Sequence, residues 1–240
     1  MANIPQNFLF RLRFPVKRVP AEIVKAKKIA PEALDASYGI PFWSLYDLPD
    51  GFDKRSGEPG LLRARNPEIE KFFDFRFGWA KEGLFFTVVV TGKKTQPFWT
   101  HLDLRAADCV RLCLDTRDVK DIHRGTKFCH KFLFYPFVGE SIDACAPMAQ
   151  WAPVNRAKAS PYAVDVAEFK TTAQVRDDGY AFSAFLPAST LTGYDVDELD
   201  RLGLHYVVRD SQHGAFVLQY ADPAPCEDDP SLWASFVFQK

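Results

Sequence analysis

The chain has 240 residues, 47% of them hydrophobic, and its 30 basic and 31 acidic residues give a net charge of −1. Without a basic excess nothing attracts a nucleic-acid backbone, so no nucleic-acid partner is expected. A chain of this length is compatible with one all-β domain, residues 1–240, that buries a sizeable core. The 22 Phe residues, and 17 Pro against 13 Gly, favour strands and rigid loops over helices.

The chain has an odd number of cysteines, which therefore cannot all pair within it: Cys109, Cys113, Cys129, Cys145 and Cys226. Cys109 and Cys113 lie four positions apart on one expected strand, about 13 Å at the usual rise, which is too far for a disulfide. We therefore expect thiols in a reducing compartment.

No stretch approaches the roughly 18 apolar residues of a membrane span, so no membrane partner is expected. Arg11 and Arg13 interrupt the apolar positions of the N-terminus, and no small-residue cleavage site follows, so this segment does not resemble a signal peptide. The expected location is cytoplasmic, or exported if the natural chain is longer than this sequence.

Residues 1–70 have an irregular pattern, and we expect them to pack onto the rest of the domain. Apolar residues alternate over positions 8–14, which predicts an edge strand ended by Pro15. Positions 21–30 predict a short helix that Pro31 stops.

Regular strand patterns begin near residue 73, where aromatic residues alternate up to Trp79. Residues 84–90 form an apolar run rich in Phe and Val, typical of a strand buried on both faces. Residues 108–115 and 128–135 alternate with period two, so each is expected to turn one face inward.

The later chain predicts a hairpin, because 169–176 and 180–186 flank an Asp-Asp-Gly turn. Residues 202–210, 215–220 and 233–238 follow as further strands. Short strands without long helices between them predict an all-β fold, a jelly-roll or immunoglobulin-like β-sandwich of two antiparallel sheets with few short helices.

Several ordered segments closely resemble family 9 carbohydrate-binding modules. They are the run WAKEGLFFTVVV, a loop that carries Trp99, the strand DCVRLCLD, and the later segments FKTTAQVRDDGYAFSAFL, LGLHYVVRD and PSLWASFVF. The resemblance covers roughly residues 71–240. It implies a jelly-roll-like sandwich that grips sugars between two aromatic rings and is not itself catalytic. By position in the family pattern, Trp99 and Tyr220 match the two rings, although both could instead pack the ends of the sandwich.

A polar set accompanies the aromatic pair: Arg111, His130, Asn155 and Arg156. Arg111 stands where the family has an acidic residue that hydrogen-bonds sugar hydroxyls. A guanidinium only donates and prefers anions, so the expected carbohydrate includes acidic sugars. His130 either reaches the ligand or is a buried histidine satisfied by a neighbour, and Asn155 and Arg156 either contact the ligand or are simply exposed.

No metal or other cofactor is assigned. Asp115, Asp118 and Asp121 crowd one loop and could bind calcium, or could form salt bridges with nearby arginines. Zinc is disfavoured because Cys129 and His130 are adjacent on a strand and point to opposite faces. A haem group would need a Met and a His as axial ligands. Haem is disfavoured as well, because Met1 and Met148 are the only methionines.

Enzyme signatures such as a phosphate loop, Gly-x-Ser-x-Gly or His-Glu-x-x-His are absent from the sequence, so no catalytic residue is assigned. The sequence therefore predicts a non-catalytic carbohydrate-binding protein. The alternative is a structural or protein-interaction sandwich that has lost the sugar site, and the oligomeric state stays open.

Overall fold

The computed structural model describes residues 12–40, 72–97, 107–139, 144–162, 164–218 and 226–240, together with the backbone of 43–44. Trp99 and Tyr220 lie outside the described residues. No helix among these residues is long and apolar enough to cross a membrane.

The described part of the chain is mostly β, with few short helices. The strands are β1 (Arg13–Arg18), β2 (Gly39–Ile40), β3 (Trp43–Ser44), β4 (Phe73–Ala80), β5 (Gly83–Val90), β6 (Cys109–Asp115), β7 (Cys129–Val138), β8 (Ala146–Ala152), β9 (Lys170–Arg176), β10 (Gly179–Pro187), β11 (Arg201–Asp210), β12 (Gly214–Val217) and β13 (Ala234–Phe238). The helical segments are α2 (Ala21–Lys25), η1 (Ala36–Tyr38), η4 (Val166–Glu168), η5 (Ala188–Thr190) and η6 (Pro230–Leu232).

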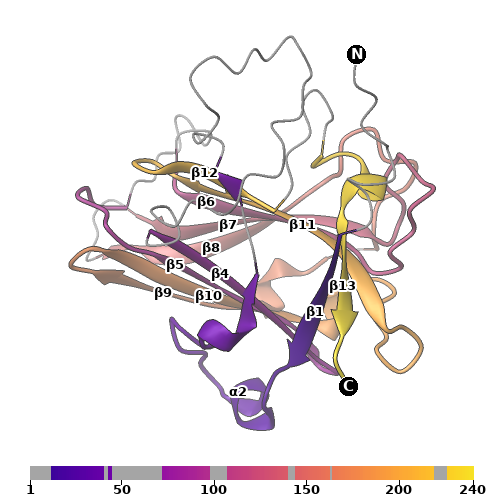
Figure 1. Ribbon diagram of the computed structural model, residues 1–240, viewed down its shortest axis with the longest axis horizontal. Coiled ribbons are helices and arrows are strands. Elements are labelled where there is room, and N and C mark those ends of the chain that lie inside the picture. Colours follow the sequence, from indigo (N-terminus) through magenta and orange to yellow (C-terminus); the bar gives the residue numbers. More distant parts are fainter. Residues whose placement is uncertain are drawn as a thin grey trace.

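The strands form two layers. One has the order β8-β7-β6-β11-β13, with β12 beside β11, and the other has the order β4-β5-β10-β9. β1 joins them, because its first four residues pair with β13 and its last two pair with β4. Figure 1 shows the two layers, with β1 and β13 closing one side, so the sandwich is nearly barrel-shaped.

The core lies between the layers and is rich in aromatic rings. Phe75 of one layer stacks on Tyr206 of the other with ring centroids 3.8 Å apart, and Phe86 meets Phe134 edge-on at 5.0 Å. All four side chains are essentially inaccessible to water. Because aromatic pairs of this kind add to the energy of burial, the alternating Phe positions hold the two sheets together.

The strand predictions from residue 73 onward are confirmed, except that β12 ends at Val217 and residues 219 and 220 of the predicted strand 215–220 lie outside the described residues. The predicted hairpin of β9 and β10 is present, with Gly179 directly after its turn. Only glycine fits at this position, because a Cβ would lie 2.0 Å from the carbonyl oxygen of Val90. The cysteines Cys109, Cys113 and Cys129 are buried, unpaired thiols.

Two predictions for the N-terminal part are wrong. Pro15 does not end a strand, because β1 runs through it. The carbonyl of Leu12 accepts from Ser235 of β13, and that of Val16 accepts from Gln239 just after it. The period of two therefore directs the nitrogen of Pro15 to the other edge, where no N–H is needed. The predicted helix over 21–30 stops at Lys25, since the following segment is extended at Ala26 and then buries Ile29 against the sheet.

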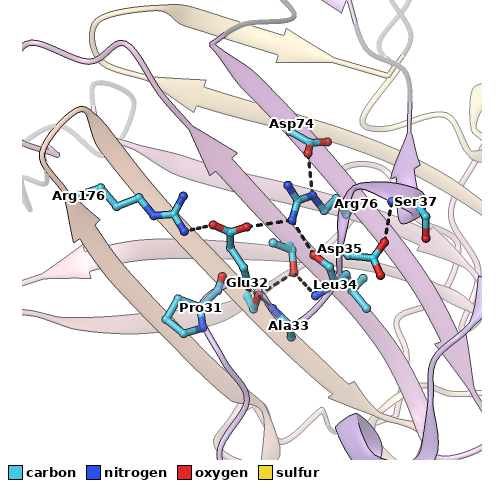
Figure 2. Close-up of polar contacts among 11 residues, drawn as sticks. Pro31, Glu32, Ala33, Leu34, Asp35, Ser37, Asp74, Arg76 and Arg176 are labelled. Atoms are coloured by element: carbon cyan, nitrogen blue, oxygen red, sulfur yellow. Dashed lines mark hydrogen bonds and ion pairs between the residues drawn. The ribbon is translucent and has the colours of Figure 1, made fainter.

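The segment from Pro31 to Ser37 lies across the outer face of the layer that contains β4, as Figure 2 shows. Arg76 donates to Asp74, to Glu32 and to the carbonyl of Leu34, and Arg176 pairs with the other oxygen of Glu32. This face of the sandwich is therefore covered by the protein itself, whereas the candidate site lies on the other layer.

Candidate functional site

The outer face of β6, β7 and β11 carries polar side chains. Side chains alternate along a strand, so Arg111, Lys131 and His205 point away from the core while their sequence neighbours point into it. The register brings them together, since Cys113 lies opposite both Lys131 on β7 and His205 on β11. Three residues far apart in the sequence thus share one patch of sheet.

Glu227 joins this patch from the loop before η6. One oxygen of its carboxylate lies 2.6 Å from Arg111 Nη1, and the other lies 3.0 Å from Lys131 Nζ. Asp228 lies 3.7 Å from the same ammonium. The side chain of Arg111 is 32% exposed and that of Glu227 is 23% exposed, so the pair remains open to solvent and to a ligand.

Hydrogen bonds fix the loop that carries Glu227. The Trp233 indole donates to the carbonyl of Cys226 at 2.6 Å, and the Cys113 thiol donates to the carbonyl of Glu227 at 3.7 Å. Downstream, Asp229 caps η6 by accepting from the backbone of Ser231. The Glu227 carboxylate is therefore positioned by the fold and is not a freely moving surface group.

The charges of the patch act on one another. Burial raises the pKa of Glu227, but Arg111 and Lys131 lower it by more, so the net shift is downward and the carboxylate is ionised at neutral pH. Burial lowers the pKa of His205 to about 4, so the imidazole is neutral. Its Nδ1 is buried and has no hydrogen-bond partner among the described residues.

The patch therefore combines charged donors with charged acceptors at the surface. Arg111 and Lys131 can only donate hydrogen bonds, whereas ionised Glu227 and Asp228 can only accept them. A hydroxyl group both donates and accepts, so neighbouring hydroxyls on one molecule match this arrangement. Small molecules rich in hydroxyl groups are the ligands that the patch fits chemically.

The predicted site residues are only partly brought together. Arg111 belongs to the patch, and Asn155 lies at its edge, where its amide is 3.4 Å from Asp228. Arg156 is exposed in the same loop, has φ of 57°, and accepts a bond from Arg124 through its carbonyl. The positions of Trp99 and Tyr220 relative to the patch are outside the described residues.

His130 lies on the opposite face of the sheet from Arg111. It is buried in the core beside Phe132, with ring centroids 5.7 Å apart. The backbone of Thr192 is the neighbour that hydrogen-bonds its ring, as expected for a buried histidine. Burial lowers the pKa of His130 to about 4. The structure therefore does not bring His130 together with Arg111.

Sequence reasoning missed Lys131, His205, Glu227 and Asp228. For Lys131 and His205 a signal existed, since both occupy the outward positions of strands whose alternation was recognised. For Glu227 and Asp228 there was none, because they lie in a loop without periodicity and meet the sheet only in three dimensions.

Two of the three aspartates considered for calcium, Asp115 and Asp118, are occupied by protein groups. Asp115 accepts from the backbone of Arg117 at 3.0 Å and of Val119 at 2.8 Å. Asp118 pairs with Lys120 at 2.5 Å and with Arg201 at 3.1 Å, and also accepts from Ser235. Within the described ranges, no group of three or more His, Cys, Asp or Glu side chains is arranged to hold a metal ion.

Comparison with known proteins gives matches among solved structures. No family model matches the sequence, and no curated protein matches it. A family 9 carbohydrate-binding module from Caldicellulosiruptor kristjanssonii, solved in complex with glucose, is 13% identical and has a TM-score of 0.54, with 95% of each chain covered. A candidate carbohydrate-binding protein from Bacteroides uniformis ATCC 8492 is also 13% identical, with a TM-score of 0.53, and the match covers 95% of this chain and 99% of that one.

A third structure is a family 9 module from Caldicellulosiruptor kristjanssonii in complex with cellotriose. It is 16% identical, with a TM-score of 0.46 and coverage of 70% of this chain and 74% of that one. The two longer matches show that this chain has the β-sandwich fold of family 9 carbohydrate-binding modules, and the expected fold class is confirmed.

Proposed function

We propose that this protein binds carbohydrate without transforming it, and that the outer face around Arg111, Lys131 and Glu227 contributes to the binding site. One observation carries the proposal. The Glu227 carboxylate bridges Arg111 and Lys131, at 2.6 and 3.0 Å, on a partly exposed face of the sheet. The similarity in fold to a module solved with glucose supports the same conclusion.

The chemistry of sugar recognition matches this face. Each hydroxyl of a pyranose donates one hydrogen bond and accepts others, so it can accept from an N–H of Arg111 and donate to the Glu227 carboxylate without separating the two. Charged partners strengthen such bonds, and partial burial reduces competition from water.

Trp99 and Tyr220 complete the proposed site. The axial C–H groups of a sugar pack on the π face of an aromatic ring, which leaves the hydroxyls for the polar groups. In the sequence, Trp99 precedes β6, the strand of Arg111, and Tyr220 follows β12 by three residues. We assign the stacking contacts to these two rings.

Calorimetry with a panel of oligosaccharides, including glucose and cellotriose, tests the proposal. The intact protein is expected to bind one or more of them saturably. Arg111→Ala and Trp99→Ala should each weaken that binding by at least about tenfold, which corresponds to about 1.4 kcal/mol. Arg13→Ala is the matched control, because Arg13 is exposed on β1, and its affinity should equal that of the unaltered protein.

A folded protein that binds no sugar across the panel would refute carbohydrate binding. Circular dichroism and a cooperative thermal transition show whether each variant is folded. The structural or protein-interaction sandwich would then be the better description of this chain.

A further inference from the structure

Glu227 occupies the position at which an anionic ligand would meet the two cations of the patch. Its two carboxylate oxygens contact Arg111 and Lys131 separately, at 2.6 and 3.0 Å. Asp228 adds a second negative charge 3.7 Å from Lys131. Among the described residues, two carboxylates therefore offset these two cations.

The third polar side chain of the patch adds no charge. His205 on β11 is buried on the same face, and the charges of Glu227, Arg111 and Lys131 all influence its titration. It is neutral at pH 7, because burial lowers its pKa to about 4. Its Nδ1 is buried and uncharged, so it does not attract an anion.

The carboxylate of a uronic acid would meet two obstacles on this face. It would lie beside the ionised Glu227 and close to Asp228, and like charges at short range repel. It would also have to take Arg111 away from Glu227, leaving a three-quarters buried carboxylate without its strongest partner. A neutral sugar meets neither obstacle, because its hydroxyls can share the existing charges.

We propose that Glu227 is the specificity-determining residue of the site: by neutralising Arg111 and Lys131 it selects neutral sugars and rejects acidic ones. This inference rests on the proposed carbohydrate-binding function. Arg111 alone predicts a preference for acidic sugars, and the structure points instead to neutral ones. The reason is that the loop before η6 supplies Glu227, the carboxylate acceptor that is missing from β6. Removing the charge of Glu227 would leave Asp228 as the one carboxylate that the described residues place beside these two cations, and would convert the face into a carboxylate-binding one.

The test compares methyl glucoside with methyl glucuronide, and cellobiose with cellobiouronic acid, by calorimetry at pH 7 and constant ionic strength. The unaltered protein should bind the neutral member of a pair at least about tenfold more tightly. Glu227→Gln keeps the shape of the side chain and removes its charge, so it should shift the ratio of the two affinities toward the acidic member by at least about tenfold. Glu227→Asp keeps the charge and should retain the neutral preference.

Glu22→Gln is the control for a lost negative charge, since Glu22 is exposed on α2, and it should leave the ratio unchanged. Equal affinity of the unaltered protein for both sugars would overturn the inference and leave the proposed function standing, and so would a ratio that Glu227→Gln does not change. Absence of any saturable binding, by the unaltered protein and by folded Glu227→Gln alike, would instead overturn the proposed function and the inference with it.

Discussion

Arg111 and Glu227 are 116 positions apart in the sequence, and a hydrogen bond of 2.6 Å joins their side chains on the outer face of β6. The contact ties the loop before η6 to the middle of a sheet, and it places a donor beside an acceptor at a solvent-accessible point. A pair in this position can be reached by a ligand, as the proposed function requires.

Another ion-paired cluster, around Lys93, is fully buried and is expected to stabilise the fold. Lys93 lies with its ammonium 2.9 Å from Asp210 and 3.4 Å from Asp108, all inaccessible to water. Lys93→Met would leave two buried carboxylates without their cation, and we expect a loss of about 3–5 kcal/mol in the free energy of unfolding. Urea unfolding of this variant and of the unaltered protein measures the loss.

The neighbouring substitution Lys94→Met is the control for that measurement, because Lys94 is exposed. It should change the free energy of unfolding by less than about 0.5 kcal/mol. Equal midpoints for the two variants would show that Lys93 does not stabilise the fold.

Stability should fall on mild acidification because of two buried histidines. Burial lowers the pKa of both His130 and His205 to about 4, whereas the unfolded value is near 6.5. Between these values the unfolded chain binds more protons, so the free energy of unfolding decreases as the pH falls, by roughly 1 kcal/mol per pH unit for each histidine. Above about pH 6.5 the two residues cause no further change.

Urea unfolding between pH 6.5 and 5 checks this slope. The double variant His130→Gln/His205→Gln removes both titrating groups and should show a distinctly flatter dependence over that window. A slope identical to that of the unaltered protein would mean that the two imidazoles are not held neutral in the folded state.

The buried hydroxyls of Ser183 and Thr87 hold the segment from Pro31 to Ser37, which Figure 2 shows, against the sheet. Ser183 Oγ donates to the carbonyl of Pro31 at 2.9 Å and accepts from the backbone N–H of Ala33 at 3.2 Å, and it lies 2.7 Å from Thr87 Oγ1. Ser183→Ala leaves these buried groups unpaired, so we expect a loss of about 1–3 kcal/mol. Amide hydrogen exchange at Ala33 should become faster.

Ser189→Ala provides the comparison, because the hydroxyl of Ser189 is exposed and donates to Glu168. Its effect on stability should stay within about 0.5 kcal/mol, with the exchange rate of Ala33 unchanged. If exchange at Ala33 were equally slow in the Ser183 variant, the hydroxyl would not be what holds the segment.

The hairpin of β9 and β10 requires glycine at its turn. Gly179 has φ of 156°, and a Cβ there would lie 2.0 Å from the carbonyl oxygen of Val90 on β5. Gly179→Ala should therefore destabilise the protein by more than about 1 kcal/mol, since the backbone of β5 would have to move. Thermal unfolding detects the change, and Asp177→Ala, at an exposed turn position, should have a much smaller effect.

Apart from β8, the sequence by itself determined the strands after residue 73 and which of their side chains face the core. Period-two alternation is a local property, so it already placed Phe132 and Phe134 inside and Arg111 outside, before any partner was known. The turn at Gly179 was equally readable, because the conformational freedom of glycine is needed at the turn itself.

Only the tertiary structure decided what the outward residues meet. The register of β6, β7 and β11 places Arg111 near Lys131 and His205, and the loop before η6 then adds Glu227. Alternation predicts a face and not a partner, because pairing between distant segments depends on topology and register. The same reason explains β1, whose parallel pairing with β13 and β4 arises only when both layers are in place.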